Sequence, residues 1–484
     1  MNTNLLRSVV YIAALCGLYL STAMLIPAMV DLYYGDAHWS VFTVSAAMVG
    51  GLSVTAAMAT RGPPPAFSKR MGFLLVNVLW ATFSLIGAIP IYFSELELTF
   101  AQALFESVSA ITTTGSTVLV GLDDMAPGLL VWRSLLQWLG GIGIVALGLF
   151  VLPFLRVGGV SFFKMESSDI GDKPFARIAT FTRAFVAIYV AITLICMIAY
   201  DVFGMSHFDA LNHALTTIAT GGFSTHDASF GYFNSYALRW IATFFMTVCS
   251  LPFSILIVFF IKGRLDALRD PQILVFLGYL GAFAIAAALY NHLRNGVDLP
   301  LALSHSFFNF SSILSTTGYA SEDYTLWGPF AVAAAFFATF MGGCSGSTAG
   351  GIKAYRFVIL FNIILTGMKK LIYPNAVYSV RYGSQIVDAD TQRAVFLFFS
   401  AYTFIWVVGS LAMALAGYDF ATASSAVITA LSNVGPGIGS LIGPAGNFAM
   451  MADPELYILS LAMLLGRLEV LTVMVLLVPL FWRS

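Results

Sequence analysis

The sequence contains few charged residues for its length. Only 10% of its 484 residues are Asp, Glu, Lys or Arg, whereas soluble domains carry about 25%. Hydrophobic residues make up 59% of the chain, and the mean hydropathy is +0.87. This composition excludes a water-soluble globular protein and indicates an integral membrane protein.

Cysteine and histidine are also scarce. The cysteines lie in apolar segments without metal-ligand spacing or an extracellular pairing context, so we interpret them as small buried hydrophobic residues. The histidines show no spacing that indicates a transition metal, and no Ser-His-Asp set or pair of catalytic carboxylates indicates an enzyme. The residues concerned are Cys16, Cys196, Cys249, Cys344, His207, His213, His226, His292 and His305.

Ten apolar runs are long enough to cross a bilayer, so the sequence predicts an all-α polytopic membrane protein. The first run is not followed by the cleavage site of a signal peptide, and we interpret it as a spanning helix. The eighth has 38 residues and would measure about 57 Å as one helix, so it must break at its glycines. The runs are 9–30, 39–59, 71–93, 129–155, 184–203, 238–261, 273–289, 330–367, 395–416 and 456–482.

Basic residues are concentrated in alternate loops, which the positive-inside rule places in the cytoplasm together with both termini. The opposite loops contain only Arg133, Arg239 and Arg294 as basic residues, and their many acids would attract cations. The basic loops at 155–183 and 368–393 lack interleaved aromatic residues, so no nucleic acid partner is expected.

Four semi-apolar stretches, each too short to span, follow spans 3, 5, 7 and 9 and end at a glycine. These glycines, Gly115, Gly221, Gly318 and Gly435, are 106, 97 and 117 residues apart. The spacing predicts a helix, re-entrant loop, helix module that is repeated four times. The expected units are an N-terminal helix pair at 1–62 and pore modules at 63–160, 161–265, 266–372 and 373–484.

Non-helical backbone at membrane depth is tolerated only inside protein or beside a water-filled cavity, so four such stretches indicate a shared central cavity. A short helix that descends from the outer face directs its partly negative carbonyl end towards the membrane centre. Carbonyl and threonine oxygens after it can replace the hydration shell of a monovalent cation. A glycine after a helix is also an ordinary C-cap, but four at one topological position favour a pore.

The segment GGCSGSTAGG in the eighth span has low helix propensity and many small polar groups. If the span unwinds here, the segment lies just below the four glycine-ending stretches, which would form the ion filter, and it can obstruct ion passage. The alternative is close helix packing through small residues. A nucleotide-binding P-loop is rejected, because Ile352 and Ala354 occupy positions where that motif requires Gly and Ser or Thr.

Two ionisable residues, Arg467 and Glu469, lie near the middle of the tenth span, where such side chains are costly and mark functional sites. Two residues apart on one helix, they would diverge by about 200° and would not pair with each other. For Arg467, anchoring to another acid is the structural alternative.

The four modules, the extra N-terminal pair and the sequence FMGGCSGSTAGGIK resemble the Trk/Ktr/HKT superfamily of potassium transporters, in particular its bacterial TrkH-type members. The resemblance covers essentially the whole chain and includes Arg467. It implies potassium uptake across the inner membrane, one pore per subunit, a homodimer and a cytosolic nucleotide-binding regulatory subunit of the TrkA type. It implies that the protein binds the potassium ion that it transports, and that it has no organic cofactor.

The resemblance also implies roles for residues. A glycine in the first filter segment, here Gly115, accompanies potassium preference, whereas serine shifts plant relatives towards sodium. The fourth segment departs from the threonine pattern and has Pro436 after its glycine, so some sodium or rubidium passage is expected. The ion-binding residues would be Thr113, Thr114, Ala219, Thr220, Thr316, Thr317, Asn433 and Val434. The gate would be Gly342, Gly343, Cys344, Ser345, Gly346, Ser347, Thr348, Ala349, Gly350, Gly351 and Arg467.

Other functions compete with a potassium channel-like transporter. An ion-coupled carrier for an organic solute usually has two inverted halves and broken helices, whereas this chain has four modules of parallel topology and one clearly broken span. An intramembrane enzyme would need a catalytic set that the sequence does not show. A transporter of both sodium and potassium from the same superfamily is a further alternative, and coupling to protons or sodium stays open.

Overall fold

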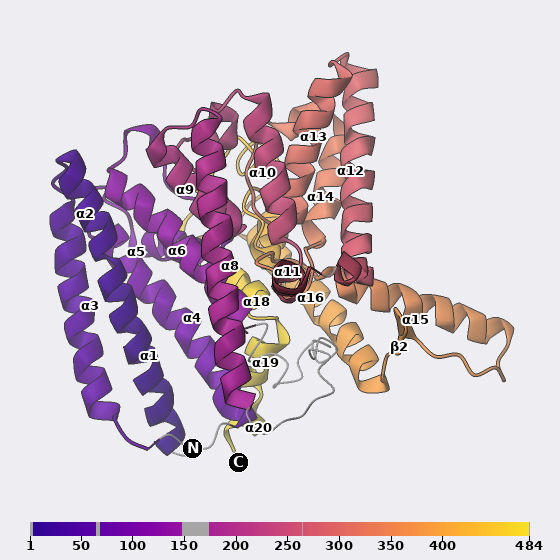
Figure 1. Ribbon diagram of the computed structural model, residues 1–484, viewed down its shortest axis with the longest axis horizontal. Coiled ribbons are helices and arrows are strands. Elements are labelled where there is room, and N and C mark those ends of the chain that lie inside the picture. The colour runs from indigo at the N-terminus through magenta and orange to yellow at the C-terminus, as the bar shows by residue number, and fades with distance from the viewer. Residues whose placement is uncertain (1–2, 64–67, 148–173, 264, 484) are drawn as a thin grey trace.

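The structure is a computed structural model that describes residues 3–63, 68–147, 174–263 and 265–483. It is mostly helical, and the sheet in this part of the chain is a small hairpin of β1 (Arg381–Tyr382) and β2 (Gln385–Ile386). Both termini lie at the same end of the helical bundle (Figure 1). Outside the described residues lie the expected module boundary at 160–161 and the basic residues Arg156, Lys164 and Lys173.

The helices form an N-terminal group and four sets that each contain an outer helix, a short pore helix and an inner helix. The N-terminal group is α1 (Thr3–Ala23), α2 (Leu25–Tyr34) and α3 (Trp39–Thr60). The first two sets are α4 (Lys69–Tyr92), α5 (Phe100–Ile111) and α6 (Pro127–Ala146), then α8 (Pro174–Val202), α9 (His207–Ile218), α10 (Tyr236–Cys249) and α11 (Phe253–Lys262). The others are α12 (Pro271–Asn295), α13 (Leu299–Leu314), α14 (Pro329–Phe340) and α15 (Ala354–Ile372), then α16 (Ala389–Leu415), α17 (Phe420–Ser432), α18 (Asp453–Arg467), α19 (Leu471–Leu477) and α20 (Pro479–Trp482).

The four sets close into a ring, because the inner helix of each set packs against the pore helix of the next. The contacts are α6 with α9, α10 with α13, α14 with α17, and α18 with α5. Small residues permit close approach within and between sets: a Cβ at Gly140 would lie 2.1 Å from the Ile111 carbonyl oxygen of the same set, and one at Gly141 would lie 3.1 Å from Ala219 Cα at the end of α9. The N-terminal group packs outside the ring against α4 and α6.

Polar side chains cap three of the four short pore helices, and Asp298 before α13 makes no such bond within the described residues. Thr99 and Gln102 form a capping box at α5, while Ser206 and Asp419 accept backbone hydrogen bonds at α9 and α17. The caps satisfy amide groups that the first turn of a helix cannot pair. The pore helices therefore have defined starts, although each is too short to cross a bilayer.

Seven helices of the described residues are long and apolar enough to cross a membrane, or nine if each of two bent pairs counts as one span. These nine lie where nine of the ten expected spans were placed. The eighth expected span is divided into α14 and α15 by residues 341–353, so its expected break is confirmed. Figure 1 shows α15 projecting sideways from the bundle, with the hairpin beside it.

The expectation of one clearly broken span is wrong, because two other spans bend sharply. The chain turns by 100° between α10 and α11 and by 115° between α18 and α19. Pro252 directly precedes α11, and it cannot supply the amide that would continue α10. Glu469, between α18 and α19, has a φ of 60° and so leaves the helical conformation.

The positions of two arginines also differ from expectation. Arg133 and Arg239, which were assigned to loops, lie within α6 and α10 and are buried. Both arginines already fall inside the apolar runs 129–155 and 238–261, close to their outer ends, and the helices begin still earlier, at Pro127 and Tyr236. The arginines are therefore part of the protein interior rather than of the outer loops.

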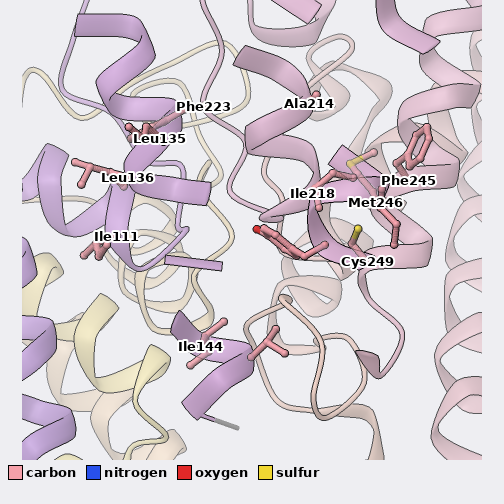
Figure 2. Packing of buried hydrophobic residues seen from close by; sticks show 14 of the residues in the cluster. Ile111, Leu135, Leu136, Ile144, Ala214, Ile218, Phe223, Phe245, Met246 and Cys249 are labelled. Carbon is pink, nitrogen blue, oxygen red and sulfur yellow. The ribbon is translucent and has the colours of Figure 1, made fainter. Parts of the chain in front are cut away.

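Buried apolar side chains fill the space between the first two sets of helices (Figure 2). Leu135 and Leu136 of α6 belong to the same cluster as Ile218 of α9 and Met246 of α10. Interiors of this kind are close-packed and transmit strain rather than absorb it. The cluster therefore fixes the positions at which the pore helices end.

Candidate functional site

The four pore helices are followed by the same backbone turn. Each turn contains a non-glycine residue in the left-handed region and, two residues later, a glycine with positive φ. Threonine and bulky residues rarely adopt the left-handed conformation, so its fourfold recurrence marks four equivalent sites. The pairs are Thr113 with Gly115, Thr220 with Gly222, Thr316 with Gly318 and Asn433 with Gly435.

This geometry corrects the register of the second segment. Gly222, with a φ of 76°, occupies the position equivalent to Gly115, and the expected Gly221 lies one residue before it. Ala219 is the right-handed C-cap of α9, and so it is not equivalent to Thr113. Two adjacent glycines make either register possible in the sequence, and the end of α9 at Ile218 selects the later one.

The four glycines and the four preceding carbonyl groups form a closed ring. A Cβ at Gly115 would lie 2.2 Å from the oxygen of Gly221, and one at Gly222 would lie 1.8 Å from that of Thr317. The ring closes through the other two glycines: Gly318 would place a Cβ 2.0 Å from the Val434 oxygen, and Gly435 would place one 2.9 Å from the Thr114 oxygen. Each of these positions therefore requires glycine for two reasons: a Cβ would overlap the neighbouring carbonyl oxygen, and the positive φ disfavours other residues.

Two of the threonine side chains in the turns bond to neighbouring hydroxyls, whereas the buried Thr113 hydroxyl has no hydrogen-bond partner among the described residues. The Thr114 hydroxyl lies 2.7 Å from that of Thr112, and the Thr317 hydroxyl lies 2.7 Å from that of Ser315. In the fourth segment, Asn433 instead donates to Thr114 Oγ1 over 3.0 Å. The backbone carbonyls thus become the best candidates for ion ligands, because the side chains fix the turns that position them.

Residues 341–353 form a loop, here called the gate loop, that lies against the inner ends of the pore helices. Thr348 Oγ1 donates to the Ile218 carbonyl at the end of α9 over 3.3 Å. The Gly350 amide donates to the Thr316 hydroxyl, and a Cβ at Gly350 would lie 2.4 Å from the Ser432 oxygen. The loop therefore touches the second, third and fourth segments at once.

The bend between α10 and α11 receives the other side of the gate loop. The Cys344 amide donates to the Ser250 carbonyl, and the Phe253 amide donates to that of Gly346, each over 2.9 Å. Thr348 Oγ1 also donates to Cys249 O over 3.2 Å. The bend exposes backbone groups that a continuous helix would pair internally, and the gate loop satisfies them.

Arg467 and Glu469 were expected to lie on one helix, but the structure separates them. Arg467 ends α18, and Glu469 follows the break and forms an ion pair with Arg356 of α15. The Arg467 guanidinium is buried and makes no hydrogen bond to any residue that the structure describes. Anchoring of Arg467 to another acid, which was the structural alternative, thus finds no partner among these residues.

Arg467 lines a cavity of about 30 Å³ between the gate loop and the α18–α19 break. Lys353 and Glu469 also line it, and the Lys353 ammonium donates to the Ala349 carbonyl within the loop. Such a volume holds roughly one or two waters. The cavity is therefore small and bordered by two cationic side chains.

At the opposite end of the filter, His226 links the first two segments. It hydrogen-bonds Asp123 and lies 3.3 Å from an Asp209 oxygen, and its ring stacks on Tyr232. Burial lowers the pKa of His226, but hydrogen bonds and charge interactions with Asp209 and Asp123 outweigh this effect and raise it above the usual value. The same hydrogen bond with His226 holds the pKa of Asp123 below its usual value.

Sequence reasoning missed the roles of four ionisable residues around these elements, three of them buried and Lys353 partly buried. Glu106 pairs with Arg133 behind the filter, and Arg356 and Lys353 adjoin the gate loop. A signal was present for Glu106, because an acid within an apolar stretch at membrane depth indicates a functional position. Lys353 and Arg356 gave a weaker signal, because they follow the glycine-rich segment and resemble an ordinary basic helix end.

Comparison with known proteins adds independent findings. The model of the TrkH family, described as a cation transport protein, matches residues 41–483. The chain is 41% identical to the Trk system potassium uptake protein TrkI of Halomonas elongata, over 98% of this chain and 96% of that protein. It is 37% identical to the Trk system potassium uptake protein TrkH of Salmonella typhimurium, over 99% of both chains.

A solved structure is similar along the whole chain. The crystal structure of the potassium transporter TrkH from Vibrio parahaemolyticus superposes with a TM-score of 0.92, at 34% sequence identity and with 100% of both chains covered. The match includes the closed arrangement of helices, the pore helices and the divided eighth span as parts of one fold.

Proposed function

We propose, on the premise that this chain belongs to the TrkH family of cation transport proteins, that it takes up potassium ions across a membrane through a pore within one subunit. The family is one of transporters rather than enzymes. The ring in which four carbonyl groups meet four glycines is the observation that carries the proposal. Four separate modules would not converge in this way for packing alone.

The filter would bind potassium through backbone oxygens. The carbonyls of Thr114, Gly221, Thr317 and Val434 replace part of the hydration shell of the ion, and the residue before each adds a further oxygen. The carbonyl ends of α5, α9, α13 and α17 converge on the same place and contribute partial negative charge. Potassium is thus the transported ion, and no resident cofactor takes part.

The four filter walls are unequal, which bears on selectivity. Gly115 stands where the superfamily has glycine with potassium preference. The fourth wall has Asn433, Val434 and Pro436 in place of the threonine pattern. Potassium is the preferred ion, and sodium and rubidium pass to a smaller extent.

The gate consists of the gate loop, 341–353, together with Arg467. The loop touches three filter segments from below, and the cavity beside it is too small for a hydrated ion. An arginine in the same cavity repels a cation that leaves the filter. Opening therefore requires the loop to move away from the ends of α9 and α13, and the membrane potential then drives uptake with about 2.3 kcal/mol per charge per 100 mV.

The protein resides in the bacterial inner membrane, and both termini face the cytoplasm. The termini lie at one end of the bundle, and the acidic cluster around His226 lies beyond the other end of the filter. The positive-inside rule places the basic loops with the termini. Potassium therefore enters from the side that carries Asp123 and Asp209.

Two partners fit the cytoplasmic side of the fold, namely a second copy of this chain and a nucleotide-binding regulatory subunit of the TrkA type. The projecting α15 exposes large apolar side chains, among them Phe361, Ile364 and Met368. An apolar helix of this kind usually covers a partner surface. The same helix ends with Lys369 and Lys370 and begins at the gate loop, so docking there would act directly on the gate.

Potassium flux into liposomes under an imposed membrane potential tests the proposal. The wild-type protein should carry potassium, and Gly318→Ala should abolish the flux because its Cβ would meet the Val434 oxygen. Gly281→Ala is the matched control, because Gly281 lies in α12 and a Cβ there meets nothing within 4 Å.

Two outcomes would contradict the proposal. One is wild-type protein that is folded and inserted but carries no potassium. The other is undiminished flux in Gly318→Ala at equal protein content. Exchange of an organic solute in place of potassium would favour the competing carrier function.

A further inference from the structure

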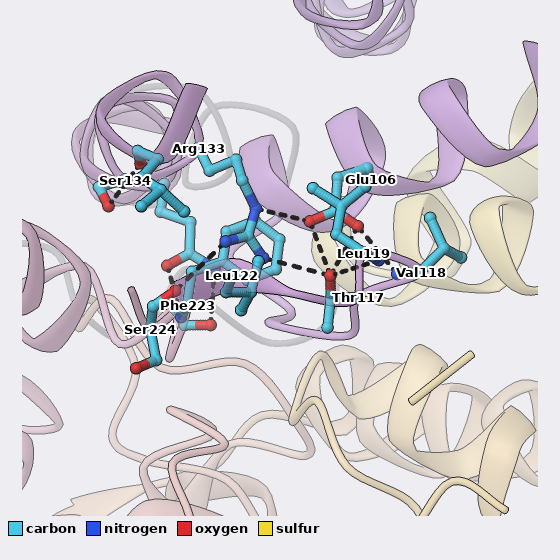
Figure 3. Close-up of polar contacts among 12 residues, drawn as sticks. Glu106, Thr117, Val118, Leu119, Leu122, Arg133, Ser134, Phe223 and Ser224 are labelled. Atoms are coloured by element: carbon cyan, nitrogen blue, oxygen red, sulfur yellow. Dashed lines mark hydrogen bonds and ion pairs between the residues drawn. The ribbon is translucent and has the colours of Figure 1, made fainter. Parts of the chain in front are cut away.

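Glu106 and Arg133 form an ion pair that is fully enclosed by protein (Figure 3). Arg133 Nε lies 2.8 Å from Glu106 Oε1, and the two side chains are 1% and 0% exposed. Glu106 comes from pore helix α5, and Arg133 comes from inner helix α6 of the same module. Both side chains contact residues that follow the filter glycines rather than the ring carbonyls. The pair therefore lies behind the filter and outside the ion path.

The pair reaches two neighbouring filter segments. Glu106 accepts the Val118 amide and the Thr117 hydroxyl of the first segment, each at 3.0 Å. Arg133 donates to Thr117 Oγ1 and to the Ser224 carbonyl of the second segment, each at 3.2 Å. One guanidinium group therefore connects the strands that follow Gly115 and Gly222.

The aromatic ring between these strands adds a further contact. The guanidinium carbon of Arg133 lies 4.1 Å from the centroid of the Phe223 ring. A guanidinium at this distance from an aromatic face is attracted by the ring quadrupole. Phe223 directly follows Gly222, so its position depends on the same arginine.

The other pore helices hold their strands with neutral groups at or next to the corresponding position. Seven residues before each left-handed residue stand Glu106, His213, Asn309 and Ala426. His213 hydrogen-bonds the Ser224 hydroxyl, and Asn309 accepts the Ser321 amide. In the fourth module, Ser425 accepts the Ile438 amide. The first helix alone uses a charge at this position.

We infer that Glu106 and Arg133 are positioning residues that fix the first and second filter segments relative to each other and thereby set the preference for potassium over sodium. This inference rests on the proposed function. The preference depends on how closely a filter can hold its oxygens around an ion. A pair that joins two walls resists their closure around the smaller sodium ion.

Stability alone does not explain the pair. Replacing both members of a buried ion pair with uncharged residues is often neutral or stabilising, whereas removing one member leaves an uncompensated charge and is strongly destabilising. Neutral groups suffice for the same contact in the other three modules. The charge is therefore best explained by the geometry that the forked guanidinium provides, because it binds Glu106, Thr117 and Ser224 at once.

Three variants in liposomes test the inference, namely Glu106→Gln, Arg133→Met and the double variant that combines them. Competition of sodium with potassium flux gives the selectivity, and thermal unfolding gives the stability. We expect each single variant to reduce potassium preference by about tenfold, because binding oxygens must be held to within about 0.5 Å. The double variant should recover stability without recovering selectivity.

Two further variants separate positioning from general damage. Arg133→Lys keeps the charge but not the fork, and it should give intermediate selectivity. Arg239→Met removes another buried arginine, which donates to Ser304 of α13 and not to a filter strand, and it should keep wild-type selectivity.

The inference is overturned if the double variant regains wild-type selectivity together with stability, because the pair would then be structural only. It is also overturned if folded single variants select potassium as the wild type does. A wild-type protein without potassium flux would instead refute the proposed function itself.

Discussion

The filter and the gate loop are both built from glycine-rich backbone, but their glycines meet different neighbours. In the filter, Gly115 and Gly318 each meet a carbonyl from another module. In the gate loop, Gly342 meets Gly350 and Gly351 meets Gly342, while Gly350 also meets the Ser432 oxygen of the fourth segment. Contacts between modules therefore fix the filter glycines, whereas the gate loop is held partly by contacts within itself.

The two regions also differ in charge. The ring of glycines and carbonyls contains no ionisable side chain, and the ion pair nearest to it is balanced and enclosed. The cavity at the gate loop is lined by Lys353, Arg467 and Glu469. A site that discriminates between ions needs fixed neutral oxygens, and a site that stops ions can use charge.

The strongest test concerns the register of the second segment. Gly222→Ala should reduce potassium flux by at least about 100-fold, because its Cβ would meet a backbone oxygen in the ring. Gly221→Ala should cost less, because the atoms nearest to its Cβ belong to the side chain of Gln137 rather than to a backbone oxygen of the ring. Equal losses in liposome flux, with both variants folded, would contradict the assignment of Gly222 to the ring.

Removal of positive charge at the gate should increase potassium flux rather than reduce it. Arg467→Met should increase potassium flux in the absence of a regulatory subunit by about tenfold, because a buried cation no longer repels the ion. Arg467→Lys keeps the charge and serves as the control, with flux close to that of the wild type. Unchanged flux in Arg467→Met would exclude this residue from the gate.

A smaller gain in selectivity for potassium should come from giving the fourth filter segment the threonine that the first and third segments have. Val434→Thr places a hydroxyl two residues after Ser432, as Thr114 and Thr317 have after Thr112 and Ser315. Sodium competition should then weaken about threefold, because the turn gains a bond that two other segments possess. Val434→Ala lacks the hydroxyl and should show no gain, and a gain in both variants would refute the explanation.

The smallest effect concerns pH at the outer mouth. The pKa of His226 is raised in the folded protein, so its stabilising contribution is complete below the unfolded value of 6.5 and is lost as the pH rises through the folded value. The midpoint of thermal unfolding should fall by about 2 °C or less across that window. His226→Gln should abolish this dependence, and an equal slope in both proteins would contradict it.

The sequence predicted the features that depend on local composition. Four short stretches ending in glycine revealed the pore segments, and the excess length of the eighth span revealed the gate loop. The bend after Cys249 and the break at Glu469 were missed, because both lie within apolar runs that continue beyond them. The backbone groups at the first bend are satisfied by the gate loop, and the Glu469 side chain pairs with Arg356, so both depend on neighbours distant in sequence that no local pattern records.

The candidate site was predicted less completely than the fold. Of the adjacent Gly221 and Gly222, the sequence analysis assigned Gly221 to the wall, and the end of α9 places Gly222 there instead. The partnership of Glu106 with Arg133 spans two helices and an intervening strand, so spacing along the chain could not indicate it. Side-chain roles at such distances depend on packing, and packing follows from the whole chain.

A ring drawn from one polypeptide has a consequence for how such pores change over generations. In an assembly of four identical subunits, one mutation alters every quadrant together. Here a single codon alters one quadrant and leaves three as they were, as Val434 and its threonine counterparts already illustrate. Ion preference can therefore drift in small steps, without passing through a form in which all the walls fail at once.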